Sequence, residues 1–258
     1  MSTPTRWQDL RAHTAARVAL GRVGNGLPTA AHLDFQEAHA RARDAVHSAL
    51  DIPALRATLD LESLIVASEA ADRRSYLLRP DLGRRLRSAD AVSLPAVPGA
   101  FVFVLADGLC ASGVQREAPP LLAEAVPLLH AAGLDIGPVV IAQQARVALG
   151  DAIGEAMQAS FVAVLIGERP GLTALDSMGL YLTHAPRRGR SDAERNCISN
   201  IRRGGLSAPE AARKLLWLIG AARRLGATGI ALKDEQPGTP YAVKEGSTAP
   251  AIARTGTP

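Results

Sequence analysis

The strongest constraint on the fold is an alternation of two sequence patterns that begins at residue 101. Short, largely apolar runs occupy 101–108, 137–143 and 161–171, and segments with helical spacing lie between them at 119–133 and 150–160. Such apolar runs are typical of strands covered on both faces, and strands that alternate with helices of this length indicate right-handed βαβ units. The sequence therefore predicts the α/β class, with a Rossmann-like or flavodoxin-like, doubly wound and mostly parallel sheet.

The pattern continues less regularly after residue 171. We expect a strand at 180–186, a long arginine-rich loop at 187–206 and a last short strand at 228–235. Long loops in compact domains are usually functional, so we expect the loop to contact a ligand or a partner; a solvated insertion is the alternative.

The segment 208–225 is the clearest helix in the sequence. Ser207 and Glu210 form a capping box in front of it, and Gly226 follows it as a stop signal. Its apolar residues recur at helical spacing, which predicts that the helix covers one face of the sheet.

The first part of the chain is expected to be a mainly helical N-terminal region, residues 1–95. The patterns there predict helices at 7–20 and 34–50 and one strand at 63–70. A stretch containing proline and glycine at 88–100 indicates a connection. We therefore divide the chain into 1–95 and a main domain at 96–258, with a frayed tail at 237–258.

Charge and composition argue against nucleic acid as a partner. The net charge is +4, but aromatic residues make up only 3% of the chain and the arginines are scattered in pairs. Proteins that bind single strands need aromatic stacking platforms, and those that bind duplexes need a concentrated basic face. We expect no nucleic-acid binding.

The chain also lacks the sequence signs of a membrane protein or an exported protein. Its longest apolar runs, such as 215–222, fall far short of the roughly 20 residues that a membrane span needs, and no hydrophobic signal segment opens the chain. Two cysteines, Cys110 and Cys197, cannot form a framework of several disulfides. We expect a soluble, cytoplasmic protein with no membrane contact.

Two acidic residues stand where predicted strands end. Asp107 lies in "ADGL" and Glu168 in "GERPGL", each beside a glycine. Ligands of open α/β sheets bind outside the carboxyl ends of the strands, so both carboxylates are candidates to accept hydrogen bonds from a ligand that the glycines allow to approach the backbone. The alternative is that these residues serve only to form turns.

Other common kinds of site find little support. The glycines at 21–26 have neither the dinucleotide-binding nor the P-loop spacing. No carboxylate completes a metal site with His39 and His47, and no histidine lies close in sequence to Cys197 to activate it. The stretch at 128–133 differs from the cobalt-binding Asp-x-His-x-x-Gly loop of one class of cobalamin proteins, because Leu128 replaces the aspartate before His130.

Six segments of the chain carry a more specific signal: "TAARVALGRVG", "YLLRPDLGRRL", "ADGL", "IGERPGL", "RNCISNIR" and "EAARKLLWLIGAARRLG". In this order they closely resemble the small (light) subunit of ethanolamine ammonia-lyase. The resemblance covers about residues 10 to 235, and several of the motifs are long and nearly unbroken.

The resemblance implies a hetero-oligomeric enzyme that uses adenosylcobalamin to convert ethanolamine to acetaldehyde and ammonia by a radical mechanism. It also implies a large TIM-barrel subunit that holds the substrate, with the small subunit lying against the corrin. The cofactor in this family keeps its own benzimidazole as the lower cobalt ligand. We therefore expect this chain to provide cofactor contacts, but no catalytic residue and no metal ligand.

The family's cobalamin contacts match this sequence at Val147, Glu168 and Cys197, and Arg146 is a neighbouring candidate. Glu168 is expected to accept hydrogen bonds from amide side chains of the corrin. The segments around Val147 and Cys197 are expected to offer backbone groups and small apolar contacts.

Two departures from the family pattern bear on location and on the site. Family members often carry an N-terminal extension linked to packaging in a bacterial microcompartment, whereas this sequence starts almost at the first helical motif. The cytoplasm and the microcompartment both stay open as locations. Cys110 stands where the resemblance leads us to expect serine.

Two other functions remain as alternatives. A stand-alone doubly wound enzyme or binding domain for a nucleotide-like ligand would act without a partner. A purely structural interaction subunit would bind the large subunit without contacting cobalamin.

Overall fold

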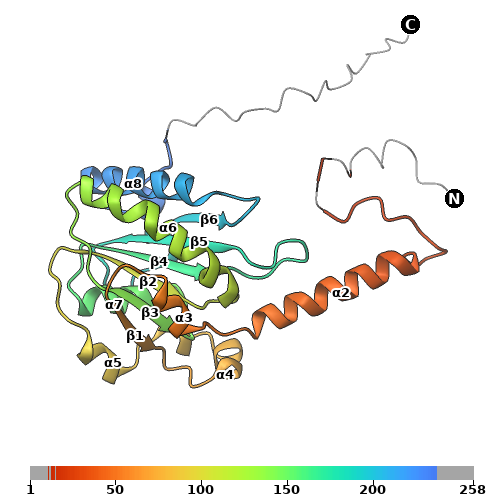
Figure 1. Ribbon diagram of the computed structural model, residues 1–258, viewed down its shortest axis with the longest axis horizontal. Coiled ribbons are helices and arrows are strands. Elements are labelled where there is room, and N and C mark those ends of the chain that lie inside the picture. Colours follow the sequence, from red (N-terminus) through yellow and green to blue (C-terminus); the bar gives the residue numbers. More distant parts are fainter. Residues whose placement is uncertain (1–10, 12, 15, 237–258) are drawn as a thin grey trace, which may run out of the picture.

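The computed structural model describes residues 11, 13–14 and 16–236. Its centre is a six-stranded sheet in the order β1-β3-β2-β4-β5-β6, with helices on both faces (Figure 1). The expected α/β class is confirmed. The strands are β1 (Ser63–Ala67), β2 (Phe101–Ala106), β3 (Val139–Gln143), β4 (Phe161–Gly167), β5 (Met178–His184) and β6 (Asn196–Ile201).

The sheet is mixed rather than parallel throughout. Strands β1, β3, β2 and β4 run parallel, β5 runs antiparallel to β4, and β6 runs antiparallel to β5. The reason lies in the connection at 168–177, which contains no helix and returns the chain beside β4. This topology does not establish the doubly wound, Rossmann-like arrangement, which stays a prediction.

The N-terminal part contributes both helices and a strand of the sheet. The strand expected at 63–70 is confirmed as β1, which pairs with β3. Residues 16–20 are not helical, so the helix expected at 7–20 does not extend to its predicted end, and most of its first half lies outside the described residues. The division at residue 95 stays a prediction. The helices here are α2 (Thr29–Val46), α3 (Ile52–Ala57), α4 (Arg73–Leu78) and α5 (Ser88–Ser93).

Apolar residues fill both sides of the sheet. One cluster packs the sheet against α6 (Ala111–Ala131) and α8 (Ala208–Leu225), and a second packs it against α7 (Leu149–Ala156). All residues of β2 and β4 are buried, as their continuous apolar sequences predict. Each fully buried Leu or Phe side chain stabilises the fold by about 1.5–3 kcal/mol.

Helix α8 agrees with its sequence signals, whereas helix α6 does not. The helix α8 has the predicted bounds: the Ser207–Glu210 capping box is formed, and Gly226 ends the helix with φ +74°. Helix α6 begins at Ala111, directly after β2, and not at residue 119 as expected. The early start was missed because Pro119 and Pro120, which lie inside the helix, are residues typical of a first helical turn.

Two further expectations for the second half were wrong. The segment 187–206 is not one loop, because β6 lies within it and buries Ile198 and Ile201 against the core. The segment 228–235 is not a strand; it contains a short 3₁₀ turn, Gly229–Ala231, in which Gly229 has φ +85°. Strand β6 therefore forms the edge of the sheet. The predicted frayed tail at 237–258 lies outside the described residues.

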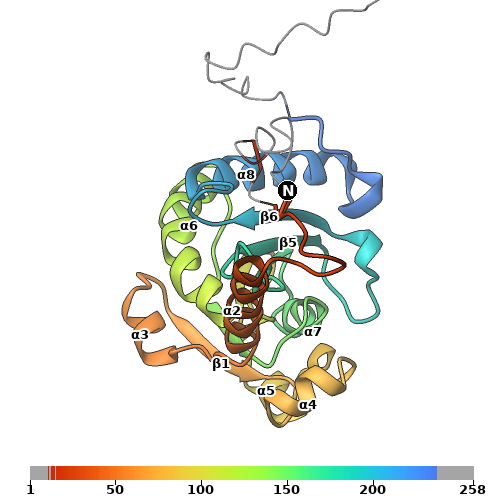
Figure 2. The same cartoon turned by 90° about the vertical axis from the view of Figure 1, so that its right-hand side faces the viewer.

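Helix α2 projects from the body of the molecule on the side where the parallel strands end (Figures 1 and 2). Among its 18 residues only Ala38 is buried, and Leu33 and Phe35 are exposed. In the described part of the chain, no helix is long and apolar enough to cross a membrane.

Candidate functional site

A cavity of about 460 Å³ opens where β2 and β4 end. This is the edge at which ligands bind in open α/β sheets. The turn after β3 contributes to it as well. The lining residues are Tyr76, Gly108, Leu109, Arg146, Val147, Ile166, Gly167, Glu168, Arg169 and Tyr181.

Three of the four residues predicted to contact a cofactor share this cavity. Arg146 and Val147 reach it from the turn before α7, and Glu168 reaches it from the residue after β4. Cys197 lies in β6 and does not line the cavity. It pairs across the strands with Tyr181, which does line the cavity. The fold thus brings together segments that are far apart in the sequence.

Glu168 is held by backbone hydrogen bonds and forms no ion pair among the described residues. Its main-chain N–H donates to the Ser177 carbonyl at 3.0 Å, which fixes the start of the connection to β5. The N–H of Asn200, in β6, lies 3.3 Å from both carboxylate oxygens. No ion pair involves Glu168 within the described residues. The half-buried carboxylate therefore retains acceptor positions that face the cavity.

Asp107 has a different role from the one its motif suggested. Its Oδ1 accepts from the N–H groups of Gly108 and Ala145, and its Oδ2 accepts from the N–H of Gln144 at 2.8 Å. Burial raises the pKa of Asp107, and the three N–H donors and Arg73 oppose that rise. The carboxylate joins the ends of β2 and β3, so the turn alternative is the correct interpretation for Asp107.

The glycines at these strand ends also serve the fold. A Cβ atom on Gly108, whose φ is +57°, would lie 2.3 Å from the Gly167 carbonyl oxygen, and one on Gly167 would lie 2.0 Å from the Cys110 carbonyl oxygen. The two glycines allow the exits of β2 and β4 to pack backbone against backbone. Both glycines also line the cavity, so the expectation that they let a ligand approach the backbone stays a prediction.

Tyr76 forms the floor of the cavity beside Arg146. Its ring is buried, and its hydroxyl donates to the Ala145 carbonyl at 3.1 Å. The guanidinium carbon of Arg146 lies 4.3 Å from the ring centroid, a cation–π contact, and Nη2 donates to the Tyr76 carbonyl at 3.2 Å. Burial raises the pKa of Tyr76 to about 12, so the phenol stays protonated at neutral pH.

Cys197 is not activated as a nucleophile. Although the residue is exposed, partial desolvation of its thiol beside Tyr181 raises its pKa, and the Glu168 carboxylate adds to the rise. Reactive cysteines have a lowered pKa next to positive charge or a general base. The thiol is thus suited to contact rather than to covalent chemistry.

A buried ion pair fixes β6 relative to α7. Arg195 Nη1 lies 2.6 Å from Asp151 Oδ1, and both side chains are almost completely buried, at 1% and 4% exposure. Arg195 Nη2 also donates to the Arg190 carbonyl at 2.9 Å. Burial raises the pKa of Asp151, and Arg195 opposes the rise. The pair ties the segment before Cys197 to the helix that follows Val147.

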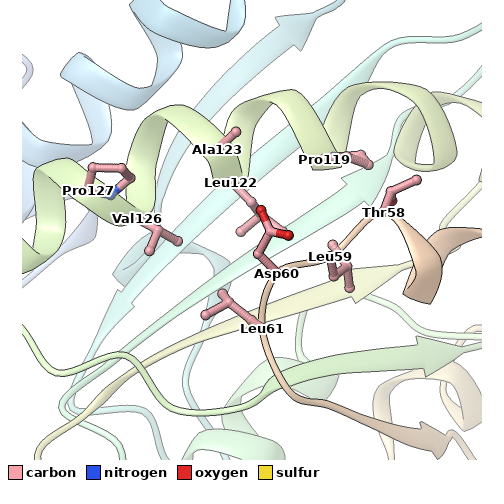
Figure 3. A pocket seen from close by; sticks show the side chains of 9 residues that line it. All are labelled: Thr58, Leu59, Asp60, Leu61, Pro119, Leu122, Ala123, Val126 and Pro127. Carbon is pink, nitrogen blue, oxygen red and sulfur yellow. The ribbon is translucent and has the colours of Figure 1, made fainter.

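A second cavity lies between the 58–61 segment and α6 (Figure 3), with a volume of about 220 Å³. Its walls are mainly the apolar side chains of Leu59, Leu61, Leu122 and Val126, and Asp60 is its one charged residue. None of the predicted contact residues lines it. The described residues contain no group of three His, Cys, Asp or Glu side chains that could hold a metal ion.

Comparison with known proteins agrees with the sequence motifs. The profile of the ethanolamine ammonia-lyase light chain family (EutC) matches residues 4–233. The chain belongs to this family. It is 52% identical to the ethanolamine ammonia-lyase small subunit of Xanthomonas campestris pv. campestris, over 91% of this chain and 92% of that protein. The small subunit of Bradyrhizobium diazoefficiens is 53% identical, over 88% and 90% of the two chains. Membership of the light chain family implies a large partner subunit.

Some residues of the site were not identified from the sequence. Tyr76, Arg169 and Tyr181 line the cavity, but no local pattern marks them as ligand contacts. Tyr76 lies in "YLLRPDLGRRL", one of the motifs by which the sequence resembles the light chain family, so that resemblance is its only signal in the sequence.

Proposed function

We propose that the cavity at the strand ends contributes to binding adenosylcobalamin where this chain meets the large, TIM-barrel subunit of ethanolamine ammonia-lyase. The holoenzyme would convert ethanolamine to acetaldehyde and ammonia. The observation that supports this function is the convergence of Arg146, Val147 and Glu168 on one cavity.

The cavity suits one edge of a flat ring that carries amide side chains. Its volume of about 460 Å³ can cover only part of a corrin, so the rest of the ring would face the large subunit. Glu168 offers free carboxylate acceptors to amide N–H groups, while Val147, Ile166 and Tyr181 offer apolar surface. These residue types fit the edge of the cofactor.

When bound, adenosylcobalamin supplies a radical by homolysis of its cobalt–carbon bond. The residues of this chain would bind and orient the cofactor and help to exclude water from its edge. Glu168 would accept hydrogen bonds, and Arg146 would hold the Val147 segment against Tyr76. Neither Tyr76 nor Cys197 has a pKa suited to proton transfer at neutral pH.

Reconstitution from separate subunits tests the proposal. The chain is co-expressed with a matching large subunit, purified through a tag on this chain only, and assayed for acetaldehyde with adenosylcobalamin and ethanolamine. We expect activity only when both subunits are present. Co-purification without cobalamin uptake would favour a purely structural subunit, and failure to associate would favour a stand-alone binder of a nucleotide-like ligand.

A further inference from the structure

Arg73, which does not line the cavity, lies directly behind it. Its Nε donates to the carbonyl of Val46, the last residue of α2, at 2.6 Å, and its Nη1 donates to the Gly108 carbonyl at 2.8 Å. The side chain is 15% exposed. One guanidinium thus joins the end of the projecting helix to the turn after β2.

The same guanidinium supports the floor of the cavity. The Cζ atom of Arg73 lies 4.7 Å from the centroid of the Tyr76 ring, over which Arg146 also lies. Arg73 and Tyr76 are three residues apart on α4, which places their side chains on one face. Side-chain capping by Asp72, which accepts from the Ser75 N–H at 2.7 Å, fixes the start of this helix.

Arg73 also balances the buried carboxylate that organises the segment 144–147. Its Nη1 lies 3.9 Å from Asp107 Oδ2, the oxygen that accepts from the N–H of Gln144. Among the described residues, no other cation forms an ion pair with Asp107. Removing Arg73 would leave this carboxylate buried and less well compensated, which would loosen its hold on Gln144 and Ala145.

We propose that Arg73 is a positioning residue of the cofactor site. It would act through Tyr76 and Asp107, which set the place of Arg146 and Val147 in the cavity. This inference rests on the proposed function, because it assumes that the cavity binds adenosylcobalamin.

The test compares Arg73→Met with Arg74→Met, a matched control at the neighbouring exposed arginine. Each variant is assembled with the large subunit, and the dissociation constant of adenosylcobalamin is measured by equilibrium dialysis. We expect Arg73→Met to raise it about tenfold, a loss typical of removing support behind a ligand-binding group. Arg74→Met should leave it unchanged.

Two further readouts separate positioning from a general loss of stability. In Arg73→Met the KM for adenosylcobalamin should rise while the KM for ethanolamine stays constant, and hydrogen exchange should accelerate at Gln144, Ala145 and Arg146 but not in α8. If Arg73→Met does not fold, Arg73→Lys serves instead; it keeps the charge near Asp107 but not the planar group over Tyr76, and it should show the same changes to a smaller extent.

The variant Glu168→Ala distinguishes a failure of the proposed cofactor-binding function from a failure of the positioning role of Arg73. Weaker cofactor binding in Glu168→Ala together with unchanged binding in the Arg73 variant would overturn the positioning role alone. Unchanged binding in both would overturn the proposed function and the positioning role with it. A parallel rise in both KM values would also overturn the positioning role.

Discussion

Two carboxylates in similar motifs have different roles because different numbers of hydrogen-bond donors surround them. Asp107 and Glu168 each follow a buried strand beside a glycine, but three backbone N–H groups converge on Asp107 and one on Glu168. Hydrogen-bond donors that come from another strand end cannot be found by looking at the motif itself. The sequence could therefore identify both candidates, but only the fold could separate the turn former from the residue that faces the cavity.

Glu168→Ala should weaken the binding of adenosylcobalamin by the assembled enzyme by about 1–3 kcal/mol, the loss expected for a charged hydrogen-bond partner. Substrate affinity should change little, because the proposed contact is with the cofactor alone. Equilibrium dialysis of the cofactor measures the first effect and the KM for ethanolamine the second. Glu155→Ala, at an exposed residue paired with Arg188, is the control. Unchanged cofactor affinity would contradict the role assigned to Glu168.

The two cysteines should differ in labelling by a thiol reagent. Cys110 is buried and Cys197 is exposed, so only Cys197 should react in the folded chain. Because burial raises the pKa of the Cys197 thiol above its ordinary value, its thiolate fraction, and hence its labelling rate, should keep rising with pH beyond the point at which an unperturbed cysteine levels off. Mass spectrometry over a pH series measures both. A rate that levels off near neutral pH would contradict the raised pKa, and Cys197→Ser should abolish labelling.

At the level of elements, sequence patterns identified most strands and helices but not how the last strands pair. The runs that became β2, β3 and β4 are largely apolar, so their burial was clear from composition. The direction of β5 depends on the short 168–177 connection, and β6 depends on Ile198 and Ile201 within an arginine-rich stretch. Few apolar residues mark β6, because only one of its faces packs on the core. Local composition therefore predicted a loop where tertiary pairing forms a strand.

The link between α7 and β6 depends on the Asp151–Arg195 pair. Asp151→Asn should destabilise the chain by about 3–5 kcal/mol, because it removes the one buried carboxylate that pairs with the buried Arg195 guanidinium. Asp192→Asn removes another partner of the same arginine, but Asp192 is 83% exposed and should cost under about 1 kcal/mol. Urea unfolding of both variants measures the difference. Equal losses in the free energy of unfolding would show that burial does not determine how much an ion pair of Arg195 contributes to stability.

At the level of the whole molecule, stability is unevenly distributed between the body and α2. Helix α8 has seven buried residues and α2 has one, although both are 18 residues long. Most helical stability in proteins comes from packing of an apolar face. The body of the chain should therefore be much more stable than the projecting helix.

Hydrogen exchange of the isolated chain should reveal this difference directly. The amides of α2 before Ala42 should exchange at the earliest times, whereas those of α8 should remain protected, because local opening of α2 disrupts few buried contacts. Mass spectrometry of peptides from the two helices measures it, with α8 as the internal control. Equal protection would contradict the prediction, unless the protection of α2 increases with protein concentration, which would indicate self-association.

The cavity at the strand ends is lined by segments that are far apart in the sequence, and this limits how its lining can be inherited. Its lining begins at Tyr76 and ends at Tyr181, with contributions from three separate stretches between them. Recombination between two related genes at any point in this interval would join complementary parts from different parents. A crossover after Leu206, before α8, would leave the lining from a single parent. The lining is therefore expected to be inherited as one block, whereas α8 can be exchanged separately.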